Sequence, residues 1–156
     1  MLTPAFDGSR EGALSDSYEI YAIRYGTKAD RHRRETFIIP PGNDPHDAPS
    51  PIDYFVWLIR NQDRTIVVDT GFDRAEGEKR GRKIDRLPRE GLAMLGVDAA
   101  TVEDVVVTHL HYDHAGTLGD FPAATFHVQD REVQYATGRH MCHDCFGYAY
   151  TAEHVC

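Results

Sequence analysis

The feature that most constrains this chain is a group of metal-binding side chains directly after the pattern of a buried strand. Residues 105–109 read VVVTH, which is typical of a strand buried on both sides, and the chain continues as LHYDHAG. Four side chains that can bind a metal fall within six positions, namely His109, His111, Asp113 and His114. A strand end gives such residues a rigid support beside an open loop. The sequence therefore predicts a metal site at the end of a core strand.

The spacing of the four residues indicates how they can divide between ions. Residues two apart in an extended segment face the same side, so His109 and His111 can converge on one ion through imidazole nitrogens. The Ala-Gly pair at 115–116 indicates a turn beginning near Asp113. Beyond that change of direction, Asp113 and His114 can point to a second ion next to the first.

Other interpretations of the motif explain fewer of its residues. Histidines paired or capped at a strand end would need no metal, but that role does not require four potential ligands within six positions. The H-x-D pair of His111 and Asp113 could belong to a two-histidine, one-carboxylate iron site, which leaves His109 and His114 without a role. The spacing also differs from H-E-x-x-H, whose histidines lie four apart on a helix.

Composition limits the remaining function classes. A chain of 156 residues is long enough for one domain, and 25 acidic against 17 basic residues give a net charge of -8, which disfavours nucleic-acid binding. The longest apolar run, residues 54–59, is too short to span a membrane. Three cysteines near the chain end are a poor disulfide framework, so we expect a soluble protein of the reducing cytoplasm.

Strand and helix patterns alternate along the chain in the manner of the α/β class. Residues 1–17 are small and polar and predict a flexible arm, with the domain at 18–156. Residues 54–59 are apolar at every position, which predicts burial on both faces. The charged stretch 77–86 predicts an exposed connection. We expect strands at 18–26, 52–59, 65–71, 105–109 and 124–128, the second and third forming a hairpin, and helices at 88–95, 116–120 and 130–138.

Three segments together resemble the metallo-β-lactamase superfamily, and within it the N-acyl homoserine lactone lactonases. They are VVDTGF (67–72), THLHYDHAG (108–116) and FPAATFHVQDREVQYA (121–136), and the resemblance covers residues 18 to about 138. It implies a four-layer αββα sandwich with two zinc ions, His109 and His111 binding the first and Asp113 and His114 the second. It also implies that Asp69 lies beneath the site and supports a ligand; on spacing alone, Asp69 could equally be a turn former.

The function that the resemblance implies is zinc-dependent hydrolysis of a small lactone or similar ester. A hydroxide held between the ions would attack the carbonyl carbon, and Asp113 would pass the proton to the leaving oxygen. Thioester hydrolysis of the glyoxalase II kind is an alternative with the same ligands, and a non-catalytic metal-binding fragment is another.

The family also needs two more histidines and a bridging aspartate downstream, whereas only 42 residues follow His114. We therefore expect the N-terminal half of the sandwich, with doubtful activity and a tendency to self-associate. The tail contains Cys142-His143-Asp144-Cys145, a C-x2-C pair that could bind metal or could consist of reduced thiols.

Overall fold

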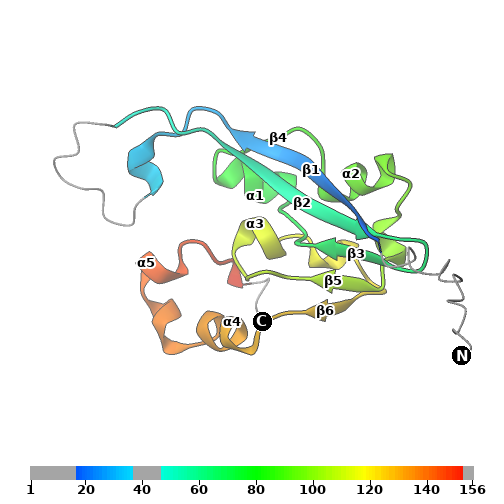
Figure 1. Ribbon diagram of the computed structural model, residues 1–156. Helices are drawn as coiled ribbons and strands as arrows, with labels where there is room; N and C mark the ends of the chain where they lie inside the picture. Colours follow the sequence, from blue (N-terminus) through cyan, green and yellow to red (C-terminus); the bar gives the residue numbers. More distant parts are fainter. Residues whose placement is uncertain (1–16, 37–46, 153–156) are drawn as a thin grey trace, which may run out of the picture.

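The computed structural model describes residues 17–36 and 47–152, which form one six-stranded mixed sheet with helices against it (Figure 1). The predicted arm lies outside the described residues except for Ser17. The order of the strands in the sheet is β4-β1-β2-β3-β5-β6. The strands are β1 (Glu19–Lys28), β2 (Ile52–Arg60), β3 (Thr65–Val68), β4 (Lys83–Ile84), β5 (Asp104–Val106) and β6 (Thr125–His127).

The predicted hairpin is confirmed as β2 and β3, which pair antiparallel with Trp57 opposite Val68. Strand β1 also pairs antiparallel with β2, whereas β5 joins β3 in parallel and β6 joins β5 in parallel. A parallel pair needs a crossover connection, and the helical segments between β3 and β5 supply it. The α/β class is confirmed, with one sheet of the expected sandwich present.

One face of the sheet forms the core and the other is uncovered. Along β2, Tyr54, Val56 and Leu58 are buried, while Phe55 and Trp57 are 38% and 41% exposed. The prediction that residues 54–59 are buried on both faces is therefore wrong for this chain, because helices of the described residues cover only one face. The core also contains Ile23, Tyr25, Val67, Phe72, Leu92, Val102, Val105, Val107 and Phe121.

The helices follow local capping signals. Helix α2 (Pro88–Met94) has proline in its first turn, packs Leu92 in the core and contacts β1. The remaining α-helices are α1 (Arg74–Lys79), α3 (Tyr112–Ala115), α4 (Asp130–Ala136) and α5 (Asp144–Gly147), with single 3-10 turns at Arg33–Thr36, Ala99–Thr101, Leu118–Asp120 and Arg139–Cys142. None of these helices in the described part of the chain is long and apolar enough to cross a membrane.

The stretch 77–86 is mostly exposed or half-buried, as its charges predict, but it contains the end of α1 and strand β4 and is not a plain connection. Asp73 caps α1 by accepting a hydrogen bond from the Glu76 amide, and β4 then pairs with β1. Glu76 is buried because its carboxylate pairs with the guanidinium of Arg80, four residues later. A charged residue can thus lie inside when its partner is one helical turn away.

Candidate metal centre

The candidate site forms where the chain leaves β3 and β5. These two strands are parallel neighbours, so their carboxyl ends meet at one edge of the sheet. The turn after β3 is tied to helix α3 by backbone hydrogen bonds, from Thr70 N to His114 O at 2.7 Å and from Gly116 N to Gly71 O at 2.7 Å. Two motifs separated by about forty residues in the sequence therefore form one rigid corner.

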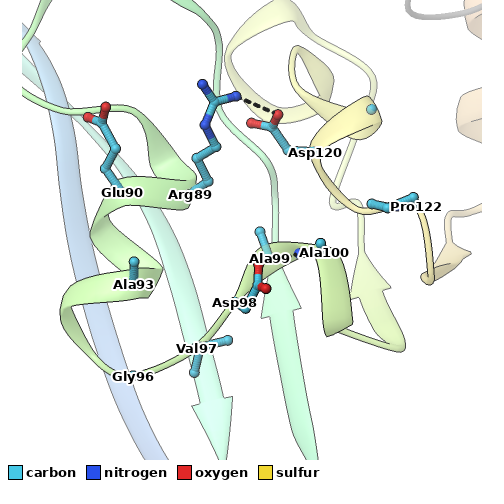
Figure 2. A pocket seen from close by; sticks show the side chains of 11 residues that line it. Arg89, Glu90, Ala93, Gly96, Val97, Asp98, Ala99, Ala100, Asp120 and Pro122 are labelled. Carbon is cyan, nitrogen blue, oxygen red and sulfur yellow. Dashed lines mark hydrogen bonds and ion pairs between the residues drawn. The ribbon is translucent and has the colours of Figure 1, made fainter.

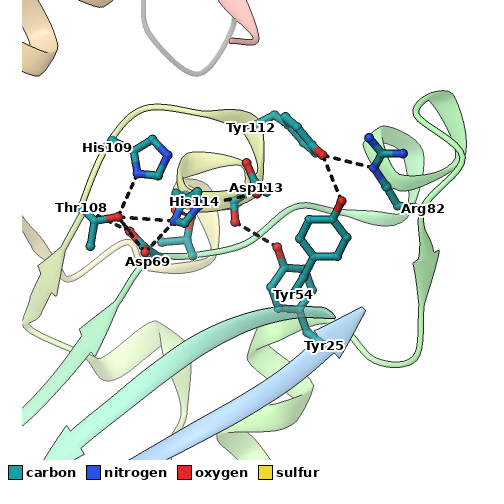
Figure 3. A network of polar contacts seen from close by, with 10 residues as sticks. Tyr25, Tyr54, Asp69, Arg82, Thr108, His109, Tyr112, Asp113 and His114 are labelled. Carbon is teal, nitrogen blue, oxygen red and sulfur yellow. Dashed lines mark hydrogen bonds and ion pairs between the residues drawn. The ribbon is translucent and has the colours of Figure 1, made fainter. Parts of the chain in front are cut away.

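Asp69 lies at the base of this corner and is almost fully buried (Figure 3). Its carboxylate accepts hydrogen bonds from the Thr108 amide at 2.8 Å and the Thr108 hydroxyl at 2.9 Å, and it contacts His114 Nδ1 at 2.7 Å. Its φ of 61° lies in the left-handed region, which Asp tolerates better than most residues. Asp69 thus holds one nitrogen of His114 and leaves Nε2 on the outer side of the ring.

The structure brings together the rings of all three histidines of the motif. The ring centroid of His109 lies 4.4 Å from that of His111 and 3.9 Å from that of His114. His109 and His111 lie on the irregular segment between β5 and α3, because the strand predicted for 105–109 ends at Val106. Asp113 and His114 lie on the single turn of α3, which is the change of direction expected after His111.

The electrostatics of the cluster differ from one histidine to another. Burial lowers the pKa of His109 and of His111, and the neighbouring histidines lower both further. Both imidazoles are therefore biased toward the neutral form, which is the form that binds metals. Burial also acts to lower the pKa of His114, but the hydrogen bond to Asp69 and the charge of Asp113 outweigh it, so the pKa of His114 is raised.

Asp113 completes the group of predicted ligands. Its carboxylate lies 3.5 Å from His114 Nε2, and its backbone carbonyl accepts a hydrogen bond from the Tyr25 hydroxyl at 2.9 Å. The donor set of three imidazoles and one carboxylate is chemically suited to zinc. Among residues 17–36 and 47–152, however, no three or more His, Cys, Asp or Glu side chains are arranged as one metal-binding group.

A second polar network supports α3 from its far side. The Tyr112 hydroxyl lies 3.5 Å from that of Tyr54 and 3.3 Å from Arg82 Nε (Figure 3). The guanidinium of Arg80 stacks 3.9 Å from the centre of the Tyr112 ring and donates to the Tyr148 carbonyl. None of these contacts is visible in the sequence, because they join segments far apart in the chain.

Sequence reasoning missed three residues that contact the motif directly. Thr108 joins Asp69 to His109, with its hydroxyl 3.1 Å from His109 Nδ1. Glu132 accepts a hydrogen bond from the Leu110 amide, and Tyr150 packs against His111. Thr108 could have been noticed as the residue before His109, and Glu132 as a carboxylate in the first turn of the predicted helix at 130–138. No sequence signal identifies Tyr150.

Two other features are separate from this cluster. Cys142 and Cys145 are exposed free thiols on the segment after α4, and neither is part of a metal-binding group among the described residues. A cavity of about 730 Å³ lies between α2 and the segments 96–100 and 119–122, beside the ion pair of Arg89 and Asp120 (Figure 2). Its lining includes none of the predicted site residues.

Comparison with known sequences finds relatives that are named as lactonases or metallo-hydrolases. It is 57% identical over 42 residues to the N-acyl homoserine lactonase AttM of Azorhizobium caulinodans, a match that covers 27% of this chain and 16% of the relative. It is 30% identical over 94 residues to a probable metallo-hydrolase of Mycobacterium tuberculosis, covering 52% of this chain and 30% of that protein. The chain therefore spans less than a third of the length of these curated relatives.

Solved structures share the fold at low sequence identity. A quorum-quenching N-acyl homoserine lactone lactonase matches with a TM-score of 0.63 and 21% identity over 87% of this chain and 52% of its own. The dizinc quorum-quenching lactonase AidC matches with a TM-score of 0.53 and 20% identity, over 78% of this chain and 45% of its own. The family model of the metallo-beta-lactamase superfamily matches residues 50–153, and the chain belongs to that superfamily.

Proposed function

We propose that this chain carries the N-terminal metal ligands of a two-zinc hydrolase that opens lactones of the N-acyl homoserine type. His109 and His111 would bind one zinc ion, and Asp113 and His114 the other. The observation that carries the proposal is the convergence of the three histidine rings beside Asp113 at one corner of the sheet.

Asp69 would orient His114 without binding metal. A carboxylate on one ring nitrogen fixes the tautomer and direction of a ligating histidine, and the contact of 2.7 Å with Nδ1 supports this role. Thr108 in turn holds both oxygens of Asp69 with its hydroxyl. Beneath the ligands, Asp69 is therefore buried with both of its carboxylate oxygens hydrogen-bonded, and Thr108 holds it from the exposed side.

Asp113 would move the proton in the reaction. Bound zinc would supply a Lewis acid that lowers the pKa of water to about 7 and polarises the lactone carbonyl. The Asp113 carboxylate would accept the proton of the attacking water and deliver it to the ring oxygen that leaves. Its backbone is held by Tyr25, so the carboxylate stays at a fixed place beside His114.

The lactone class rests on resemblance to AttM, which is named as an N-acyl homoserine lactonase. A thioester hydrolase would use the same ligands and would differ only in the leaving group. A non-catalytic metal-binding fragment would keep the ligands without turnover. No contact in the described residues favours either alternative.

The deciding experiment measures zinc bound per chain by atomic emission after dialysis. We expect the wild type to retain zinc and His109→Ala to lose at least the ion assigned to His109 and His111, because His109 contributes one of only two ligands to that ion. His127→Ala is the matched control, since His127 lies on β6 and pairs with Asp104 at 2.8 Å. Equal zinc in the wild type and in a folded His109→Ala variant would refute the metal assignment.

Hydrolysis assays then separate the three functions. We expect weak, chelator-sensitive opening of an N-acyl homoserine lactone, because each ion has two ligands from this chain where a catalytic zinc usually has three. Faster cleavage of an acyl thioester would favour the glyoxalase II type, and retained zinc without turnover would favour a binding fragment. Asp113→Asn should remain folded and lower turnover by about 10² to 10⁴, as loss of an acid or base group does. Unchanged turnover would remove Asp113 from the reaction.

A further inference from the structure

Glu132 joins the metal-binding motif to two other parts of the chain. It lies in the first turn of α4, which follows β6, and β6 is the parallel neighbour of β5. This arrangement brings the start of α4 next to the segment that leaves β5. Glu132 Oε1 accepts a hydrogen bond from the Leu110 amide at 2.9 Å and another from the Tyr150 hydroxyl at 3.1 Å. One oxygen atom therefore connects three segments.

The first of these bonds acts on the peptide between the two predicted ligands of one ion. The Leu110 amide belongs to the peptide plane that follows His109 and precedes His111, and a peptide unit is rigid. Fixing the direction of this N–H restrains ψ of His109 and φ of Leu110, two of the rotations that set how the two histidine side chains lie relative to each other. The Leu110 side chain is buried, so the residue between the ligands is held at both its side chain and its amide.

The second bond acts on the ring of His111. The Tyr150 ring meets the His111 ring edge-on, with centroids 4.8 Å apart and planes at 89°. The hydroxyl at the other end of Tyr150 is held by Glu132, and burial with the nearby Glu132 charge raises the pKa of Tyr150 to about 12. The Tyr112 amide also donates to the Ala149 carbonyl at 2.8 Å, which anchors the residue before Tyr150.

We propose that Glu132 is a positioning residue for the His109–His111 pair, acting through the Leu110 amide and through the Tyr150 ring. This inference rests on the proposed zinc function of the pair, since it states how two ligands of one ion are held at a fixed separation. Glu132 itself does not bind the ion. The half-buried Glu132 carboxylate is stable at this position because its Oε1 accepts two hydrogen bonds, from the Leu110 amide and the Tyr150 hydroxyl.

The test compares the zinc affinity of the wild-type chain with that of three variants. Glu132→Ala removes both hydrogen bonds, and we expect the dissociation constant for zinc to rise about 10- to 100-fold, as for other residues that orient a ligand. Glu132→Gln keeps an oxygen that accepts both bonds, so we expect it to stay within about threefold of the wild type. Gln134→Ala, at an exposed position of the same helix, is the control and should bind zinc like the wild type.

Two further measurements distinguish positioning from a simple structural role. Amide hydrogen exchange by NMR should show the Leu110 amide exchanging at least about tenfold faster in Glu132→Ala, while the Val107 amide, which donates to His127 O, stays protected. Lower thermal stability with an unchanged zinc constant and unchanged Leu110 exchange would overturn the proposal. If Glu132→Ala does not fold, Tyr150→Phe replaces it, because phenylalanine keeps the ring on His111 and loses only the hydroxyl. A rise of about threefold in the zinc constant is then expected, and no rise would overturn the proposal.

The experiment also separates this inference from the proposed function. A wild type that binds no zinc would refute the zinc function, and the exchange of the Leu110 amide would still decide whether Glu132 holds the segment. A wild type that binds zinc with the same affinity as folded Glu132→Ala would refute the inference alone.

Discussion

Replacing Gly116 by alanine tests how tightly the corner that carries the ligands is packed. A Cβ atom at Gly116 would lie 2.5 Å from the Tyr112 carbonyl oxygen and 2.7 Å from that of Gly71. Both oxygens belong to the backbone, so neither can rotate away as a side chain does. The φ of Gly116 is -83°, which alanine adopts freely, so any loss of stability comes from lack of space alone.

The size of the effect follows from these contacts. Forcing an extra methyl group into packed structure costs about 1–3 kcal/mol, and moving Gly116 also breaks its hydrogen bond of 2.7 Å to Gly71, worth about 0.5–1.5 kcal/mol. Alanine returns about 0.4–1 kcal/mol by restricting the unfolded chain. With the middle of each range, we expect Gly116→Ala to lower the free energy of unfolding by about 2 kcal/mol. At about 2–4 °C per kcal/mol, the midpoint of thermal unfolding should fall by roughly 4–8 °C.

The assay is thermal unfolding followed by circular dichroism in the presence of a chelator, so that metal binding does not contribute. Gly119→Ala is the matched control, since no atom lies within 4 Å of a Cβ at that position, and its midpoint should equal or slightly exceed that of the wild type. A Gly116→Ala midpoint within about 2 °C of the wild type would show that the turn after β3 and helix α3 are not in close contact.

Three further predictions concern charge, packing and association. In the presence of a chelator, Asp69→Asn should lower the free energy of unfolding by about 1.5–3 kcal/mol at pH 5.5, because the variant loses a charged hydrogen bond to His114. The pKa of His114 is raised in the folded protein, so the stabilisation by this hydrogen bond is complete below about pH 6.5 and is lost as the pH rises through the folded-state pKa. The destabilisation caused by Asp69→Asn should therefore be smaller at pH 8.5 than at pH 5.5. Equal destabilisation at both pH values would contradict the contact. Phe72→Ala should cost about 3–5 kcal/mol by denaturant unfolding, because the Phe72 ring is fully buried against Tyr25, whereas Phe126→Ala, at a site 38% exposed, should cost much less. The uncovered sheet face should make the chain self-associate, and Trp57→Lys should shift its elution in size-exclusion chromatography toward the monomer; a wild type that elutes as a monomer at all concentrations would refute this.

Local patterns in the sequence are sufficient to predict much of the fold and to propose the group of metal ligands. The apolar runs around the polar link at 60–64 predicted the hairpin of β2 and β3, and Pro88 with Leu92 predicted α2. These signals are local, because turn formers, caps and alternation act over a few residues. The ligand spacing in HLHYDH is local in the same sense, so the sequence alone predicts a metal site at the end of the strand at 105–109.

Only the tertiary structure decided which distant residues support that site. The parallel pairing of β3 with β5 brings Asp69 to His114, and that of β5 with β6 brings Glu132 to the Leu110 amide. Sequence patterns do not specify these contacts, since each depends on which strands become neighbours.

The tertiary structure also decided which side chains are buried and which are exposed. Glu76 is inside because its carboxylate meets Arg80, and Trp57 is 41% exposed although it lies in an entirely apolar run. The sequence determined which segments form strands and helices, and it predicts which residues would bind metal. The packing of the sheet determined which of those residues are supported, because support requires contacts between segments that are far apart along the chain.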